Sequence, residues 1–229
     1  KSEFSIAFTP SMTWDHHPNQ KKNRGYFNTQ LYIRHRLSSR WSIQASAALQ
    51  HRSENPEAYY PTPYYRNYRT LVHMKKELGK TQSQSYMLYT EYKRPVKEFF
   101  WTLMLNHFNI RKDHLIHTEY QDYQFKLTSL EHPHRTENYQ VRSLISKGLY
   151  SWNLKASLEA VYHYGKGLQA GQGIVQPYDN HWLSLKPKLN WNPTHWLTAS
   201  YQAEIGCSRT ISLPTLWEVQ QKLSLSIGN

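Results

Sequence analysis

Apolar and polar residues alternate along most of the chain. Over 4–14, for example, Phe4, Ile6 and Phe8 are separated by the small residues Ser5 and Ala7. Successive side chains of a strand point to opposite faces, so a period of two predicts strands with one apolar and one polar face. The pattern predicts ten such strands, at 4–14, 27–37, 41–50, 82–94, 99–110, 136–147, 154–163, 183–191, 197–205 and 217–227.

The connections between these strands alternate between short and long. Tight turns are predicted at 38–40, 94–98, 147–151 and 192–195. Long polar segments cover about 15–25, 53–81, 111–135, 165–180 and 206–215. In an up-and-down sheet the tight turns then share one end and the long connections the other, which is the layout of outer-membrane barrels. The sequence therefore predicts an all-β chain, a single antiparallel up-and-down transmembrane β-barrel segment of about ten strands with long extracellular loops.

Tryptophan placement agrees with this prediction, because all eight Trp lie near predicted strand ends. Trp41, Trp152 and Trp196 directly follow tight turns, whereas Trp14 and Trp217 lie beside long connections. Aromatic belts of this kind mark the two interfaces of a membrane. A soluble β-sandwich also has aromatic core residues, but it would have to cover ten strands that each carry a strongly apolar face.

The composition excludes several other classes of protein. The 229 residues include 28 Lys and Arg against 16 Asp and Glu, a formal charge of +12, and the aromatic share of 14% argues against disorder. No run approaches the roughly 18 apolar residues of a membrane helix, so a helical membrane protein is excluded. Cys207 is the one cysteine, which excludes an intrachain disulfide.

Several short segments carry a family resemblance. They are 67–71 (NYRTL), 83–86 (SQSY), 92–97 (YKRPVK) and 145–149 (ISKGL) before Trp152. These resemble the barrel of TonB-dependent-receptor-like outer-membrane proteins, in the branch whose complete members carry an N-terminal carboxypeptidase-regulatory-like domain and a plug. The resemblance implies a barrel of about 22 strands. The chain shows no plug domain, no coupling box and no final strand that ends in an aromatic residue, so we expect an internal part of such a barrel.

The resemblance implies a receptor or transporter that takes up a solute across the cell outer membrane. Its partners would then be outer-membrane lipid, the remainder of its own barrel and plug, and a TonB-type energy-coupling protein. The polar set would face the lumen and the apolar set would face lipid. Lumen candidates for ligand binding are Arg34, Arg36, Lys186 and Lys188.

Together with Lys155 and Lys222, these basic residues outnumber Glu159, Glu204 and Glu218, which favours an anionic or polar solute. Alternatively, the lysines solvate a wide interior, or contact lipopolysaccharide phosphates if they lie at the outer rim.

Two further clusters are candidates for binding. Tyr59, Tyr60, Tyr64 and Tyr65 surround a Pro-Thr-Pro stretch, and flat rings on a stiff backbone suit stacking on a ligand, although they equally suit packing between loops. His132 and His134 are weak metal candidates, because residues two apart on an extended chain point the same way. No Cys pair or dense carboxylate cluster accompanies them, so we expect no metal and no cofactor.

The remaining alternatives come from other classes. We expect no enzyme, since neither a Gly-x-Ser-x-Gly motif nor a phosphate-binding glycine loop is present. A small complete barrel of porin or hydrolase type stays open. A soluble basic β-rich protein that binds polysaccharide or nucleic acid also stays open, because the pI of about 9.6 is typical of such proteins. No RNP-type, zinc-finger or helix-turn-helix pattern supports nucleic acid, so no nucleic-acid partner is expected.

Overall fold

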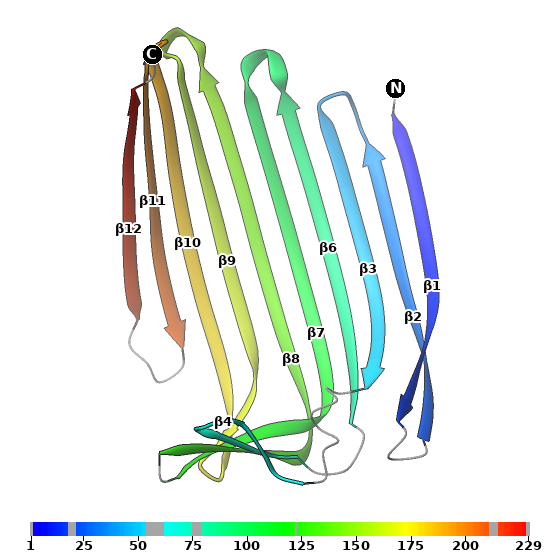
Figure 1. Ribbon diagram of the computed structural model, residues 1–229. Helices are drawn as coiled ribbons and strands as arrows, with labels where there is room; N and C mark the ends of the chain where they lie inside the picture. The colour runs from blue at the N-terminus through cyan, green and yellow to red at the C-terminus, as the bar shows by residue number, and fades with distance from the viewer. Residues whose placement is uncertain are drawn as a thin grey trace.

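The chain forms one large β-sheet (Figure 1). The computed structural model describes residues 2–17, 22–53, 62–74, 79–121, 123–210 and 215–227. Ten long strands lie in the sheet order β1-β2-β3-β6-β7-β8-β9-β10-β11-β12, each antiparallel to the next. They are β1 (Glu3–His17), β2 (Lys22–Arg36), β3 (Trp41–Ser53), β6 (Lys80–Arg94), β7 (Phe99–Gln121), β8 (Gln124–Leu149), β9 (Leu154–Gly171), β10 (Ile174–Thr194), β11 (Leu197–Thr210) and β12 (Leu216–Ile227).

Each predicted strand corresponds to one of these ten, which confirms the all-β antiparallel prediction. The predicted tight turns also lie together at one end of the sheet, the upper end in Figure 1. Two of them contain a single turn of 3-10 helix, η2 (Pro95–Lys97) and η3 (Tyr150–Trp152). Glu98 and Asn153, which end these turns, have positive φ angles of 44° and 48°.

Two of the predicted long connections are paired strand instead. The segment 111–135 belongs almost entirely to β7 and β8, which pair as far as Gln121 and Gln124. The segment 165–180 belongs to β9 and β10, which pair up to a tight turn at Gln172 and Gly173. Neither segment has a continuous apolar face, because apolar residues fall on both faces, as at the adjacent pairs Leu115–Ile116 and Ile174–Val175. A hairpin keeps its backbone ladder without a continuous apolar face. Hydrophobic alternation therefore gave no sign of these extensions.

The longest connection carries two short strands, β4 (Tyr64–Asn67) and β5 (Thr70–His73). They pair with each other, and β5 also pairs in parallel with β8 from Phe125 to Thr128. Val72 of β5 is fully buried there. This small hairpin therefore fixes part of the predicted 53–81 connection against the β7–β8 extension.

The sheet is open at both edges in the part of the chain that the structure describes. β1 pairs with β2 and β12 pairs with β11, and the strand order has these two strands at opposite ends. A small complete barrel would require β1 to pair with β12, and no such pairing occurs among the described residues. The wall is nonetheless curved along its width (Figure 1).

The strand register gives the wall two chemically different faces. Leu183, Leu185, Leu197 and Leu225 lie on one face, as predicted, and we name this the apolar face. Lys186 and its neighbours lie on the other, which we name the polar face. Large side chains of the apolar face are exposed: Phe8 by 61%, Leu158 by 44% and Leu223 by 70%.

Aromatic rows border the apolar face at two levels. At the tight-turn end, Trp41 packs on Tyr92 and Trp101 with ring centroids 4.8 and 5.8 Å apart. Toward the other end, one transverse register row carries rings on five adjacent strands: Tyr86, His107, Tyr139, Tyr164 and His181. On β6, Tyr92 and Tyr86 are six residues apart, about 20 Å along a strand. An aliphatic band thus lies between two aromatic rows.

The described residues contain no helix of the length and apolarity needed to cross a bilayer.

Substitution of neighbouring residues tests the two faces. We expect Leu158→Arg on the apolar face to lower the free energy of unfolding by about 2–4 kcal/mol in phospholipid vesicles, because it places a charge against hydrocarbon. Ser157→Arg on the polar face should change it by about 0.5 kcal/mol or less. Urea unfolding in vesicles measures both, and equal losses would contradict a two-faced wall.

Candidate functional site

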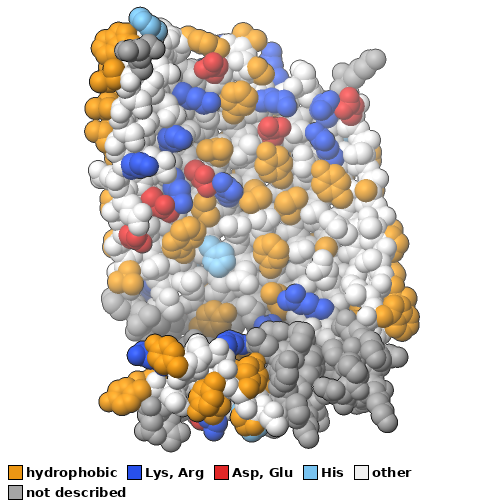
Figure 2. Space-filling model, viewed as in Figure 1, with side chains coloured by type: hydrophobic (Ala, Val, Ile, Leu, Met, Phe, Trp, Pro, Cys, Tyr) orange, Lys and Arg blue, Asp and Glu red, His pale blue; other side chains and the backbone are white. Residues whose placement is uncertain are grey.

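The polar face is the candidate functional surface. Figure 2 shows Lys, Arg, Asp and Glu side chains mixed with apolar ones across the middle of the wall. Small polar residues lie between the charges, and some are deeply buried: Ser42 is 7% exposed and Ser184 is 0% exposed. Short side chains there leave room for the long charged ones to lie along the sheet.

The best-defined cluster on this face joins β10 and β11. Lys186 Nζ lies 2.7 Å from Glu204 Oε1, and Ser184 Oγ donates a hydrogen bond of 3.2 Å to the same oxygen. Glu159 of β9 stands directly opposite Lys186 in the register. Lys186 thus has an acidic residue on each neighbouring strand, and its ammonium group pairs with Glu204.

Further ion pairs continue along the polar face. Arg142 Nε lies 2.9 Å from Glu159 Oε1, between β8 and β9. Glu91 of β6 lies 3.8 Å from Lys93 Nζ and accepts a 3.4 Å hydrogen bond from the Ser42 hydroxyl. Acidic and basic side chains thus stand next to each other on the polar face, which is not uniformly basic.

The predicted lumen residues share this face but do not form one site. Arg34 and Arg36 lie on β2, and Arg36 pairs with Glu3 at 2.9 Å. Lys186 and Lys188 lie on β10, six strand spacings away, or about 29 Å across a flat sheet. They therefore cannot contact one small solute together from these positions along the sheet.

Four further charged residues, two acidic and two basic, belong to the polar face, so the excess of basic residues expected from the sequence is unchanged. Glu3, Glu91, Lys93 and Arg142 belong to the polar face, and the pattern analysis had not assigned them there. Three of these lie on β6 and β8, whose alternation is irregular because Met87, Tyr89 and Leu144 are polar-face residues too. Lys188 makes no ion pair within the described residues, whereas Lys186 and Arg36 are neutralised by carboxylates.

The tyrosine cluster divides between described and undescribed residues. Tyr59 and Tyr60 lie outside the described residues. Tyr64 and Tyr65 are neighbours on β4, so their rings point to opposite sides of that hairpin, and Tyr65 is 60% exposed. Tyr64 is instead half-buried opposite Val72 of β5. These two rings do not make a shared stacking platform.

The histidine pair lies on β8 beyond the aromatic row. His134 Nδ1 is 3.1 Å from the backbone oxygen of His132, and burial lowers the pKa of His134, with the Lys112 charge acting the same way. A neutral ring is a possible metal ligand, but two His alone do not make a closed site. Among the described residues, no group of three or more His, Cys, Asp or Glu is arranged to hold a metal ion.

Comparison with known proteins adds little to this picture. No protein-family model and no curated protein matches the chain. Among solved structures, the outer membrane transporter YddB of Escherichia coli aligns with 97% of this chain at a TM-score of 0.43 and 12% identity. The chain spans about a third of that transporter's length, since 33% of it is covered.

The Lys186–Glu204 pair gives a measurable prediction. A double-mutant cycle with Lys186→Ala and Glu204→Ala should yield a coupling free energy of about 1 kcal/mol or less, because both side chains are about one-third exposed, 34% and 36%. The matched cycle for Arg36 and Glu3, exposed by 41% and 67%, should yield less still. Unfolding in vesicles measures both, and a larger value for the Arg36 cycle would contradict this order.

Proposed function

We propose that the chain is the wall of an outer-membrane transport barrel, in which the apolar face meets lipid and a solute passes along the polar face. One observation supports this most: most of the exposed large apolar side chains of the long strands lie on one face of the sheet, and only a few, such as Phe100, Phe108 and Leu216, lie on the other. An exposed apolar surface of this extent is unfavourable in water but suits hydrocarbon. The two aromatic rows match the girdles of such barrels.

The two open edges of the sheet support the proposal that further strands pair with it. β1 and β12 each present one edge without a partner among the described residues. In hydrocarbon, every unpaired backbone N–H or C=O costs several kcal/mol, so an open edge is tolerated poorly. We therefore propose that strands of a larger barrel pair with β1 and β12, with a plug inside it and a TonB-type protein as its energy source.

The ion pairs of the polar face favour a polar solute. Glu91, Glu159 and Glu204 form ion pairs with Lys93, Arg142 and Lys186, so acceptors stand beside donors along this face. We propose a neutral or zwitterionic polar solute over a purely anionic one, since donors and acceptors of both signs line the path. In this proposal the protein binds and conducts its solute without chemical change.

A soluble β-rich binding protein is less compatible with the apolar and polar faces of the sheet. A soluble binder of polysaccharide or nucleic acid would expose its charges and cover its apolar side chains. Here Trp217, Leu223 and Ile227 of β12 are each at least 70% exposed. No second layer of the described chain covers the apolar face across the ten strands.

Thiol accessibility tests the proposal directly, because Cys207 lies on the apolar face between Leu183 and Trp217. In outer-membrane vesicles the native thiol should react with a lipid-soluble maleimide and resist a charged, water-soluble one. Lys188→Cys, made together with Cys207→Ser, should show the opposite preference because position 188 lies on the polar face. The same preference at both positions would refute the assignment of lipid and lumen.

Surface labelling tests the direction of insertion. A tag at Gly173, in the β9–β10 turn, should be reached by antibody on intact cells. A tag at Ser39, in the tight turn between β2 and β3, should be reached only after the outer membrane is opened. Labelling of Ser39 alone on intact cells would show that the barrel is inserted the other way.

A further inference from the structure

The apolar face changes character in ordered steps along the strands. Transverse register rows on this face run from aliphatic to aromatic, then to polar, and finally to basic. The aliphatic row is Ala45, Leu88, Leu105, Val141, Tyr162 and Leu183, and the aromatic row begins at Ala47 and continues through the five rings from Tyr86 to His181. The next row is Leu49, Gln84, Asn109, Glu137, Lys166 and Asp179, and the last is His51, Gln82, Arg111 and Arg135.

A groove crosses the strands at the first two of these rows, from Leu31 and Ile33 of β2 over Ala45 and Ala47 of β3 to Tyr139 and Val141 of β8. Ala45 and Ala47 are small, whereas their register neighbours on β2 and β6 are Ile33, Leu31 and Leu88 or the ring of Tyr86. The side chains on both sides stand above the two alanines and leave a hollow of about 550 Å³. Its walls are almost wholly apolar and lie at the level of the aliphatic band.

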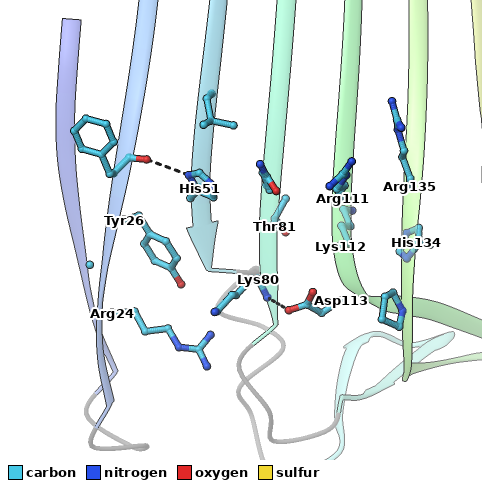
Figure 3. A pocket seen from close by; sticks show the side chains of 15 residues that line it. Arg24, Tyr26, His51, Lys80, Thr81, Arg111, Lys112, Asp113, His134 and Arg135 are labelled. Atoms are coloured by element: carbon cyan, nitrogen blue, oxygen red, sulfur yellow. Dashed lines mark hydrogen bonds between the residues drawn. The ribbon is translucent and has the colours of Figure 1, made fainter.

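A second and larger hollow begins where the groove ends. Leu49 and His51, the next residues of β3 on the same face, line a cavity of about 980 Å³. Arg24 and Tyr26 project from β2 toward it, and Arg111 reaches it from β7 (Figure 3). From Ala45 to His51 the two hollows extend for about 20 Å along one strand.

The larger cavity is strongly basic. One carboxylate, Asp113, lines it, and one of its oxygens accepts a 3.0 Å hydrogen bond from the backbone N–H of Lys80. Within the part of the chain that is described, Lys80, Arg111 and Lys112 form no ion pair. The basic side chains that line the cavity are Arg24, Lys80, Arg111, Lys112 and Arg135. Lys80, Arg111 and Arg135 have the register of the apolar face, whereas Arg24 and Lys112 have that of the polar face.

The register also places like charges directly opposite each other. Arg111 of β7 faces Arg135 of β8, an arrangement that destabilises a sheet unless an anion lies between the two groups. Arg135 is partly compensated by Glu137 at 2.8 Å and by Asn109 at 2.7 Å. Arg111 has no acidic contact among the described residues, so its guanidinium lies in the cavity ready to bind an anion.

We propose that the two hollows form one binding site for a phosphorylated lipid of the outer leaflet. An acyl chain would lie in the groove over Ala45 and Ala47, and a phosphate group of the head would contact Lys80 and Arg111. This proposal rests on the proposed function, because it requires the apolar face to meet lipid. It assigns the part of the cavity formed by Lys80, Arg111 and Arg135, which share the register of the apolar face, to the lipid side of the wall.

The occupant follows from the combination of the two hollows. A free anion needs only the basic cavity and gains nothing from an apolar groove next to it. An acyl chain alone gains nothing from the basic side chains of Lys80, Arg111 and Arg135. A molecule with phosphate at one end and hydrocarbon at the other satisfies both, and the order of rows matches the depth order of such a lipid in a leaflet.

Lipid titration of the full-length protein in detergent tests this. The probes are diphosphorylated lipid A, phosphatidylcholine and inorganic phosphate, with binding followed by native mass spectrometry. We expect lipid A to bind at least about tenfold more tightly than phosphatidylcholine, and Lys80→Gln with Arg111→Gln to remove about tenfold or more of that affinity. Ala47→Trp, which fills the groove, should also weaken lipid A and leave any binding of inorganic phosphate unchanged.

Matched variants separate this site from general lipid contact. Arg209→Gln removes an exposed basic side chain of the apolar face outside the cavity, and Ala160→Trp adds a ring outside the groove. Neither should change lipid A affinity by more than about twofold. Equal losses in the control and site variants would overturn the proposal in favour of non-specific lipid contact.

Two other results would overturn it as well. Inorganic phosphate that competes fully with lipid A would show an anion site only, and Ala47→Trp without effect would show that the groove takes no acyl chain. Flotation of the same preparations with vesicles keeps the two proposals distinguishable. Protein that inserts into vesicles but binds lipid A no better than phosphatidylcholine contradicts the lipid site alone, whereas protein that does not insert contradicts the proposed function too.

Discussion

The backbone ladder between neighbouring strands is the interaction on which every other feature of this molecule depends. A strand has no internal hydrogen bonds, so each N–H and C=O of the wall relies on the strand beside it. The register that satisfies these groups also decides which side chains share a face. A shift of one residue between any two strands would move lysines to the apolar side and leucines to the polar side over the rest of the sheet. Face separation and backbone pairing are therefore one constraint.

Alternation made the ten strands predictable because one face of each is continuously apolar. The runs around Ile6, Ala156 and Leu223 show this well, and the same parity later gave the correct faces for Leu185 and Lys186. Where apolar residues fall on both faces without alternation, the pattern contains no such information. The β7–β8 extension past Arg111 therefore looked like a loop, although its ladder continues to Gln121.

The candidate surfaces were less predictable than the fold. Parity placed Arg34 and Lys188 on one face, but it could not give their separation, which depends on how many strands lie between β2 and β10 in the sheet. The basic cavity escaped detection because Lys80 and Arg111 are far apart in sequence and meet only through the pairing of β6 with β7. Short sequence motifs do not show which residues of different strands will lie side by side in one transverse row. Only the register assembles them.

The parallel pairing of β5 with β8 has a consequence for the order in which the chain folds. The ten long strands pair with sequence neighbours, so they can form hairpin by hairpin with small loop-closure costs. β5 cannot do this, because its partner edge is on β8 and the whole β6–β7 hairpin comes first along the chain. Docking of β5, and burial of Val72 with it, must therefore be a late step that follows completion of the β7–β8 hairpin. The β4–β5 hairpin therefore stays undocked until that step.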